Sequence, residues 1–430
     1  MDERWVIVIS AGALQVPCVE AAHSLGLQVI VTDRNAGAPA VNLADDFFAI
    51  DTYDHRGHRD LVRWLIDKKH RNIVGCFTAG ADVAPTVAAC AEEAGTPGIP
   101  FDVAQRIHDK AAVRKVLRDA GLQQFQPHWL HGWTRMGMDI SVQGTVWEEL
   151  PTSICPVIVK PLHQCASRGV SIVRSREELL PAFMKVEAFE GDPVSPAGVH
   201  LGCNVLIEEY LTGSEHSAEI ILDSTRGSDA IFFNVVDRVF RYDGGIPMEL
   251  GHVNPSRLST HDQMVIYDLL CEAAKALGVT WGAFKADIIV TADGPKILEV
   301  TARLSGGWDS SVTTPLSSGR NPIRVVCAMA CGLPIKPEDI TGDKRRYAAC
   351  AAVFPKPGKI ISIKMPDWPE FRAMGIDKVI LNVQPGQAIP EYEHNAHRLA
   401  FCIASAADYD QAWANASDGA EILARSIVTE

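Results

Sequence analysis

The chain has 430 residues, which suggests about two to four domains, because a domain usually takes roughly 100–200 residues. Its composition of 47% hydrophobic and 22% charged residues is that of a folded globular protein and excludes a disordered chain. The formal net charge of −13 argues against nucleic acid or an anionic membrane as a partner, and no apolar stretch approaches the ~20 residues that span a bilayer.

The N-terminus, from Met1 to Arg4, leads directly into an apolar run and lacks the basic stretch and small-residue cleavage site of a secretory signal. The 11 cysteines are odd in number, lie among apolar neighbours and form no CxxC pair. We therefore expect free, buried thiols and a cytoplasmic location, where thiols stay reduced.

The first hundred residues predict an α/β unit, in which short apolar runs alternate with helical patterns. Strands are predicted at 5–9, 27–32 and 73–77, and helices at 16–25 and after Asp54. This alternation favours a parallel sheet with right-handed crossovers. The turn after the first strand lacks the G-x-G-x-x-G spacing, which argues against a dinucleotide site.

The rest of the chain predicts mostly strands. One helix is predicted over 102–121, and another over 261–277. Predicted strands lie at 157–160, 169–173, 205–210, 216–222, 230–236, 283–291 and 296–300. In the last hundred residues, strands are predicted at 347–354 and 378–383, and a final helix at 409–428.

The first chemical motif is a lysine before a turn. Lys160 ends one predicted strand, and residues 162–168 connect it to the next. A hairpin of this kind can close over phosphate groups with its ammonium group and loop amides. An ordinary hairpin with a surface lysine is the alternative.

The second motif is a strand end rich in acids, with the sequence VLIEEYL at residues 205–211 followed closely by Glu215. Its backbone could bind an adenine edge, and the carboxylate of Glu215 could bind a ribose diol. The alternative is an exposed strand end, which commonly carries acids.

The third motif is a pair of carboxylates, Asp287 and Glu299, on two predicted strands joined by the turn Asp293-Gly294. Near-symmetric strands would place the two acids side by side at the open end of the hairpin. Such a pair suits Mg²⁺ that bridges phosphate oxygens, although two solvated acids would look the same in the sequence.

The fourth motif begins at Arg303, whose guanidinium group suits phosphate or carboxylate oxygens. Gly306 and Gly307 follow and would let backbone amides approach a substrate. Upstream, Glu249 and His252 lie in a segment predicted as a polar loop, and a histidine of this kind is commonly structural.

In this order the segments resemble the ATP-grasp superfamily of ADP-forming carboxylate–amine ligases, and their pattern looks most like that of bacterial L-amino-acid (dipeptide) ligases. The resemblance extends to Gly307 and is looser in the last hundred residues. It implies an α/β protein with α+β lobes, namely an ATP-grasp fold after a parallel α/β domain. The implied parts are an N-terminal α/β (pre-ATP-grasp) domain at 1–105, a helical linker at 106–150, a small ATP-grasp lobe at 151–215, a large catalytic lobe at 216–331 and a C-terminal α/β appendage at 332–430.

The resemblance also implies site residues. ATP would be held by Lys110, Lys160, Ser167, Gly169, Glu208, Glu209, Tyr210, Leu211 and Glu215. Mg²⁺ (or Mn²⁺) would be bound by Asp287 and Glu299, and the catalytic residues would be Lys160 and Arg303. The substrates would contact Glu249, His252, Arg303, Ser305, Gly306 and Gly307.

The sequence departs from the family pattern at two places. Residues 162–168 contain no glycine, although the phosphate-covering loop is usually glycine-rich. Thr301 stands where many relatives have asparagine, and we do not count it as a metal ligand.

The implied reaction joins a carboxylate, from an amino acid or small organic acid, to an amine through an acyl-phosphate, with release of ADP and phosphate. One alternative is a carboxylase or synthetase that uses bicarbonate, and another is a catalytically silent nucleotide-binding regulator. The expected partners are the two small-molecule substrates, and only the resemblance suggests a homodimer. The substrate pockets could be shaped by the tryptophan-containing stretch at 129–147 and by Trp308, Asp309, Ser310 and Ser311.

Overall fold

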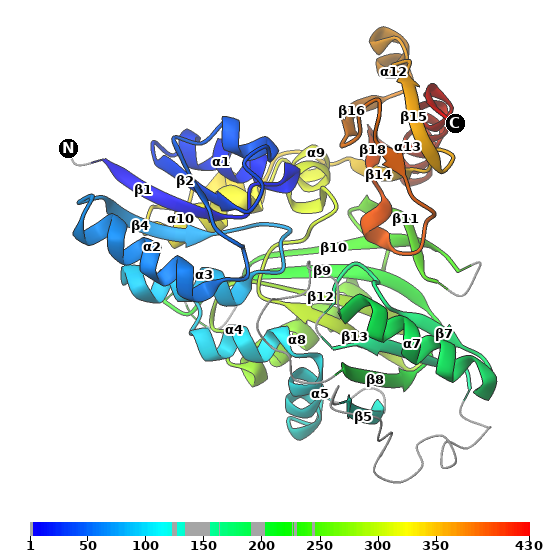
Figure 1. Cartoon of the computed structure of the whole chain (residues 1–430), viewed down its shortest axis with the longest axis horizontal. Helices are drawn as coiled ribbons and strands as arrows, with labels where there is room; N and C mark the ends of the chain where they lie inside the picture. The colour runs from blue at the N-terminus through cyan, green and yellow to red at the C-terminus, as the bar shows by residue number, and fades with distance from the viewer. Residues whose placement is uncertain are drawn as a thin grey trace.

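The computed structural model describes residues 3–122, 127–133, 155–162, 164–190, 203–225, 227, 230–242 and 246–430. In this part of the chain the strands form a four-stranded parallel sheet, an eight-stranded antiparallel sheet, a second four-stranded sheet and a three-stranded sheet (Figure 1). This arrangement confirms the predicted α/β class. Across the described residues, every helix is too short or too polar to cross a membrane.

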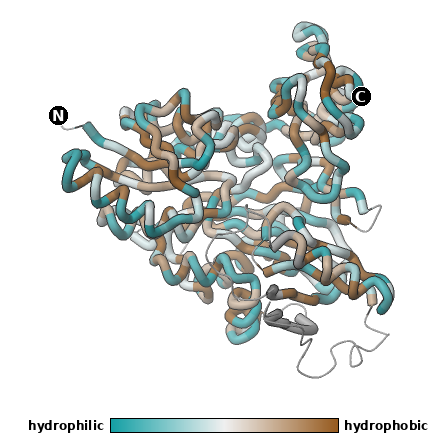
Figure 2. Tube along the Cα trace, viewed as in Figure 1, coloured by the Kyte–Doolittle hydropathy of each residue, from teal (hydrophilic) through white to brown (hydrophobic). Residues whose placement is uncertain are grey.

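The N-terminal sheet has the strand order β3-β2-β1-β4, and all its pairs are parallel, as predicted. Its strands are β1 (Arg4–Ile9), β2 (Gln28–Asp33), β3 (Asp46–Ala49) and β4 (Asn72–Phe77). The helices packed on it are α1 (Val16–Ser24), α2 (His55–Asp67), α3 (Ala84–Ala94) and, from much later in the chain, α10 (Pro322–Ala330). Because both faces are covered, the strands are nearly continuous apolar runs, whereas hydrophilic and hydrophobic residues alternate along the outer helices in Figure 2.

The helix predicted over residues 102–121 is in fact two helices, α4 (Phe101–His108) and α5 (Lys110–Asp119). Asp109 separates them with an extended backbone (φ −99°, ψ 106°), and its carboxylate accepts hydrogen bonds from two N–H groups in the first turn of α5. The prediction of one helix is wrong because an aspartate can cap a new helix instead of continuing an old one. The break places Lys110 at the first turn of α5.

The small lobe contains a sheet of order β5-β8-β6-β7. Its strands are β5 (Pro127–Trp133), β6 (Val157–Pro161), β7 (Ser171–Val173) and β8 (Cys203–Glu209), and α7 (Leu179–Glu190) packs on the sheet. The β6–β7 pair is antiparallel, which confirms the predicted hairpin after Lys160. Residues 134–150, with Trp147 of the predicted pocket stretch, lie outside the described residues.

The eight-stranded sheet has the order β13-β12-β9-β10-β11-β14-β18-β16. Its strands are β9 (Ser214–Asp223), β10 (Ala230–Arg241), β11 (Met248–Asn254), β12 (Trp281–Thr291), β13 (Gly294–Thr301), β14 (Tyr347–Val353), β16 (Ile376–Leu381) and β18 (Ala400–Ala406). α8 (Thr260–Leu277) packs on the sheet through Ile266, Leu270 and Leu277. The prediction of a polar loop around Glu249 is wrong, since this segment is strand β11 and pairs with β10 and β14.

The C-terminal part continues the same sheet, because β14 pairs directly with β11. α13 (Tyr409–Ser426) covers β14 and β18, and it is followed by β19 (Ile427–Thr429) where we predicted helix up to residue 428. The remaining elements are α9 (Thr314–Ser318), α11 (Pro337–Thr341), β15 (Gly358–Ile363), α12 (Trp368–Ala373) and β17 (Ala388–Ile389). The cysteines whose side chains are described are free thiols, and most are buried, as expected.

Candidate functional site

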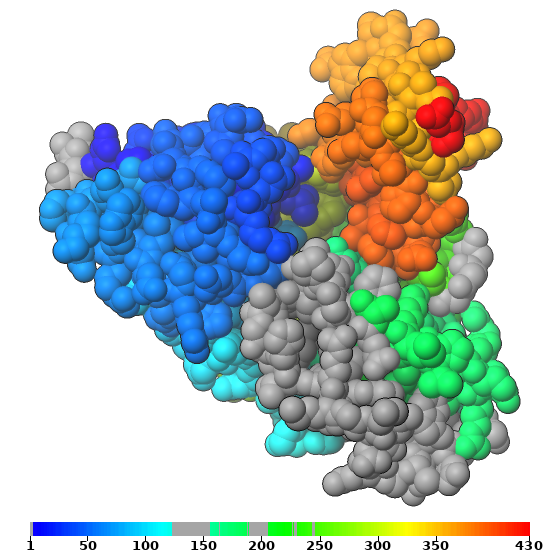
Figure 3. Space-filling model, in the orientation of Figure 1, coloured from blue at the N-terminus to red at the C-terminus, as the bar shows by residue number. Residues whose placement is uncertain are grey.

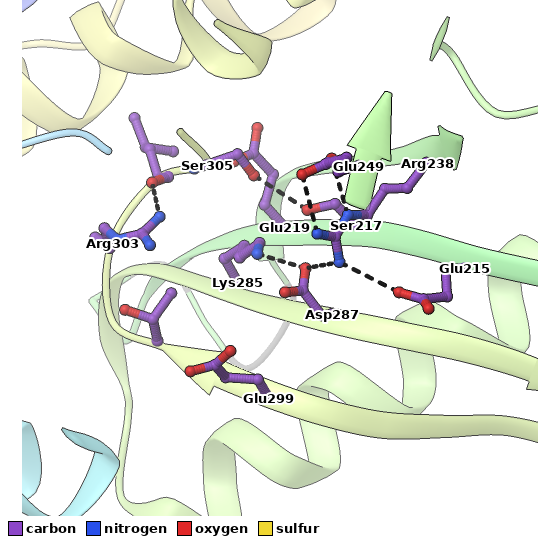
Figure 4. A network of polar contacts seen from close by, with 12 residues as sticks. Glu215, Ser217, Glu219, Arg238, Glu249, Lys285, Asp287, Glu299, Arg303 and Ser305 are labelled. Carbon is purple, nitrogen blue, oxygen red and sulfur yellow. Dashed lines mark hydrogen bonds and ion pairs between the residues drawn. The ribbon is translucent and has the colours of Figure 1, made fainter. Parts of the chain in front are cut away.

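The two acids of the third motif lie directly opposite each other. In the β12–β13 pair, Asp287 is the register partner of Glu299 (Figure 4). Directly opposed residues of antiparallel strands share a face of the sheet, so the predicted juxtaposition is confirmed.

Each of these acids is neutralised by cations. Asp287 accepts a hydrogen bond from Lys285 Nζ at 2.5 Å and lies 3.2 Å from Arg238 Nη1. Burial would raise the pKa of Asp287, but Arg238 and Lys285 hold it below its ordinary value. Lys110 Nζ lies 2.9 Å from the Glu299 carboxylate, and burial, which would lower the pKa of Lys110, is outweighed by Glu299, which raises it.

A second acid–cation group lies where α5 meets the small lobe. Glu208 on β8 is 3% exposed and forms ion pairs with Lys160 on β6 and with Arg114, whose Nε lies 2.6 Å from Glu208 Oε1. Burial alone would raise the pKa of Glu208, but Arg114 and Lys160 lower it to about 2. Lys110 and Arg114 are four residues apart on α5 and so lie on one face of that helix.

Arg303 is held by the N-terminal unit. Its Nη2 lies 2.7 Å from Asp82 Oδ1, and the same oxygen accepts a hydrogen bond from Thr301 Oγ1 at 3.2 Å. Asp82 follows β4, at the carboxyl end of the parallel sheet, where α/β folds commonly bind ligands. The Thr301 hydroxyl is thus engaged by Asp82.

Arg238 on β10 joins three acids in one network (Figure 4). It makes a bidentate contact with Glu249, at 3.1 and 3.2 Å, and lies 3.6 Å from Glu215 as well as beside Asp287. Glu249 also pairs with Arg398, at 3.1 Å. Burial would raise the pKa of Glu249, but these arginines hold it well below its ordinary value.

The other predicted residues have varied surroundings. His252 is buried, which lowers its pKa to about 4, and its Nε2 lies 2.9 Å from Thr313 Oγ1. Glu215 accepts a hydrogen bond from Tyr242 Oη at 2.6 Å, and burial raises its pKa. Ser305 donates its backbone N–H to Glu219 at 2.9 Å.

The remaining predicted residues lie in turns and at strand ends. Gly306 approaches Gly80 of the N-terminal unit so closely that a Cβ on Gly80 would come within 3.3 Å of Gly306. Gly307 has a positive φ of 63°, and Ser167 and Gly169 lie in the β6–β7 turn. Glu209 is the last residue of β8, and Tyr210 and Leu211 follow it.

A small pocket of about 30 Å³ brings several of these groups together. It is bounded by α4, α5, the turn after β6 and β13, and its polar lining residues include Asp82, Lys110, Arg114, Gln164, Glu299 and Thr301. In Figure 3 the surface is also hollowed between the N-terminal unit and the C-terminal part. Among the described residues there is no cluster of three or more His, Cys, Asp or Glu side chains that could hold a metal ion.

Sequence reasoning missed several contributors, among them Asp82, Arg238 and Arg398. Asp82 had a usable signal, because it follows a predicted strand of a parallel sheet. Arg238 and Arg398 had none, since each is defined by partners on other strands.

Comparison with known proteins agrees with the fold. Residues 153–312 match the ATP-grasp domain, and residues 352–423 match the L-amino acid ligase C-terminal domain 2. The L-amino acid ligase from Bacillus licheniformis superposes with a TM-score of 0.74 at 20% identity, covering 100% of this chain and 99% of that one. Phosphoribosylglycinamide synthetase from Anaerococcus prevotii gives 0.69 at 17% identity, with 100% of both chains covered.

Two curated relatives are similar in sequence. Dapdiamide A synthase from Enterobacter agglomerans is 25% identical over 88% of this chain and 86% of its own length. Carnosine synthase 1 from Mus musculus is 22% identical over 71% of this chain, which spans only 37% of that protein. The chain therefore carries an ATP-grasp domain. After that domain it carries the C-terminal domain 2 of the L-amino acid ligases, so the resemblance predicted from the motifs is confirmed.

Proposed function

We propose that the protein is an ATP-dependent, ADP-forming ligase that joins the carboxylate of an amino acid to an amine through an acyl-phosphate. The observation that carries this proposal is the gathering of Lys110, Arg303 and the opposed pair Asp287–Glu299 from three parts of the chain. The L-amino acid ligase C-terminal domain supports an amino acid as one substrate.

The fold family implies Mg²⁺ or Mn²⁺, and the residues present fit such an ion. Asp287 and Glu299 would hold it, since two opposed carboxylates supply the hard oxygen ligands that it prefers. When bound, the ion neutralises charge on the phosphate oxygens of ATP. Lys285 and Lys110, which neutralise the two acids here, would then be released towards other anions.

The nucleotide phosphates would lie between Lys110 and Lys160, under the β6–β7 turn with Ser167 and Gly169. The backbone of residues 209–211 would bind adenine, and Glu215 would bind the ribose. Because the Glu208 carboxylate is engaged by Lys160 and Arg114, we infer that it contributes by orienting these cations.

Transfer of the γ-phosphoryl group to the substrate carboxylate requires positioning and charge stabilisation more than covalent help from the protein. Arg303 would contact the transferring group and the acyl-phosphate, with Asp82 fixing the direction of its guanidinium group. The amine then attacks the acyl carbon and phosphate leaves. Glu249, His252 and the backbone of Ser305, Gly306 and Gly307 would surround the substrates.

The test is an ATP-hydrolysis assay against a library of amino acids and amines, with the condensed product identified by mass spectrometry. Release of ADP and phosphate only with one acid and one amine supports the ligase. Turnover with bicarbonate and no organic acid would indicate the carboxylase alternative. ATP binding without turnover would indicate a regulator. A cytoplasmic location and a homodimer remain parts of the proposal.

A further inference from the structure

The turn after β6 has a backbone conformation that its sequence does not favour. Ala166 and Ser167 both have left-handed backbones, with φ of 56° and 58°, although neither is glycine. Left-handed conformations are unfavourable for residues with a Cβ and persist only where surrounding contacts impose them. The left-handed backbones of Ala166 and Ser167 therefore need support from contacts outside the turn.

That support comes from the C-terminal part of the chain. Asn395 begins the short 3-10 helix η7 (Asn395–His397). Its backbone N–H donates to Ala166 O at 2.9 Å, and its Nδ2 donates to Ser167 Oγ at 2.9 Å. The residue that holds the turn thus lies 228 positions away from Ser167 in the sequence.

Asn395 also contacts strand β11 and Arg398. Its side-chain Oδ1 accepts a hydrogen bond from the backbone N–H of Glu249, on β11, at 2.9 Å. Its backbone carbonyl oxygen accepts a hydrogen bond from Arg398 Nε at 2.9 Å. Asn395 is 4% exposed, and all four of its polar groups have partners. A buried amide that loses its hydrogen-bond partners costs free energy. The contacts of Asn395 therefore favour the one arrangement of the turn and β11 in which all of its polar groups are paired.

The start of the turn is held from the other side. Lys110 Nζ donates to the carbonyl oxygens of Leu162 and Gln164 at 3.2 and 2.7 Å, while it also pairs with Glu299. The turn is therefore fixed at one end by a lysine of the candidate nucleotide site and at the other by Asn395.

We propose that Asn395 is a positioning residue that keeps the β6–β7 turn in its left-handed form over the phosphate site and ties it to the Glu249 strand. Its hydrogen bonds hold two residues other than glycine, Ala166 and Ser167, at positive φ, and they give the C-terminal part a role in binding ATP. The inference rests on the proposed function, because the turn would cover the phosphates of ATP.

The test compares Asn395→Ala with Asn415→Ala, which removes an amide from α13 in the same part of the chain, away from the turn. Two quantities are measured: the rate at which trypsin cleaves after Arg168, seen as a fragment beginning at Gly169, and KM for ATP. Loss of two side-chain hydrogen bonds should raise both by about tenfold in Asn395→Ala and by less than about twofold in Asn415→Ala.

A rescue variant separates this role from general damage. Ala166→Gly lets residue 166 adopt a positive φ without strain, so adding it to Asn395→Ala should bring KM for ATP at least severalfold back towards the wild-type value. If Asn395→Ala does not fold, Ser167→Ala replaces it, and we expect severalfold faster cleavage after Arg168. No change in cleavage or KM in the folded Asn395→Ala protein would overturn the proposal.

The outcomes also separate this inference from the proposed function, since proteolysis needs no ATP. Faster cleavage in Asn395→Ala, with no ATP binding by any variant, would support the contact between Asn395 and the turn but contradict the ligase proposal. Normal ATP turnover in Asn395→Ala, with an unchanged cleavage rate and an unchanged KM for ATP, would support the ligase proposal and contradict the role of Asn395.

Discussion

Two glutamates of the site, Glu208 and Glu299, both pair with lysines of the candidate nucleotide site but in different surroundings. The Glu208 side chain is 4% exposed and is held by Lys160 and Arg114 together. The Glu299 side chain is 39% exposed and pairs with Lys110. Breaking the ion pairs of a fully buried acid between two cations costs much free energy, because it leaves buried charges unpaired. A half-exposed acid can exchange its partner at a small free-energy cost, because water solvates it. We therefore expect Glu208 to stabilise the fold and Glu299 to exchange Lys110 for a metal ion.

The largest expected effect is on turnover. Glu299→Ala removes one of the two proposed metal ligands, so ADP release should fall by at least about a thousandfold. The folded structure should be retained, because the lost ion pair is partly exposed. Glu272→Ala, which removes an exposed acid from α8, is the matched control and should leave the rate unchanged. Near-normal ADP release from Glu299→Ala would contradict the proposal that Glu299 is a metal ligand.

The next effect is on stability. Glu208→Gln leaves Lys160 and Arg114 buried with too little negative charge, which should lower the free energy of unfolding by about 3 kcal/mol. Glu299→Gln should lower it by less than about 1 kcal/mol. Urea unfolding of both variants measures the difference. Equal losses would contradict the distinction drawn between the two acids.

A smaller loss is expected for Arg303, which we propose contacts the transferred phosphoryl group. Arg303→Ala should lower kcat by about a hundredfold, roughly 2.7 kcal/mol, with a smaller change in KM for ATP, because its contact strengthens as charge develops. Asp82→Asn keeps Arg303 but loosens its orientation, so its kcat should lie between those of Arg303→Ala and the wild type. Equal losses in kcat and ATP affinity for Arg303→Ala would indicate ground-state binding instead.

The smallest effect is a pH dependence. The pKa of Glu208 is lowered to about 2, compared with about 4.3 for an ordinary glutamate. A lowered pKa contributes stability above about pH 4.3 and loses it as the pH falls towards the folded value. The stability difference between wild type and Glu208→Gln should therefore narrow from pH 5 towards pH 2. A difference that stays constant in urea titrations over this range would show that the Glu208 ion pairs do not titrate with folding.

Much of the fold could be predicted because its signals are local. The parallel N-terminal sheet follows from apolar runs alternating with helical patterns, and the Asp287–Glu299 register follows from a short, near-symmetric hairpin. Two of the errors also have local causes. From the sequence pattern, Asp109 is predicted inside a helix, whereas in the structure its side chain caps α5. The β11 segment is predicted as a loop because its glutamate and histidine are residue types commonly exposed to solvent.

What the sequence by itself determined was therefore the class of protein, the order of its elements and the paired carboxylates. Only the tertiary structure decided how the polar groups are paired: Asp82 pairs with Arg303, Arg238 contacts three acids, and Asn395 donates a hydrogen bond to Ser167 in the β6–β7 turn. Local patterns report the periodicity of burial, which fixes helices and strands. A polar contact between distant segments produces no periodic pattern in the sequence, because its energy depends on a partner that only folding brings near.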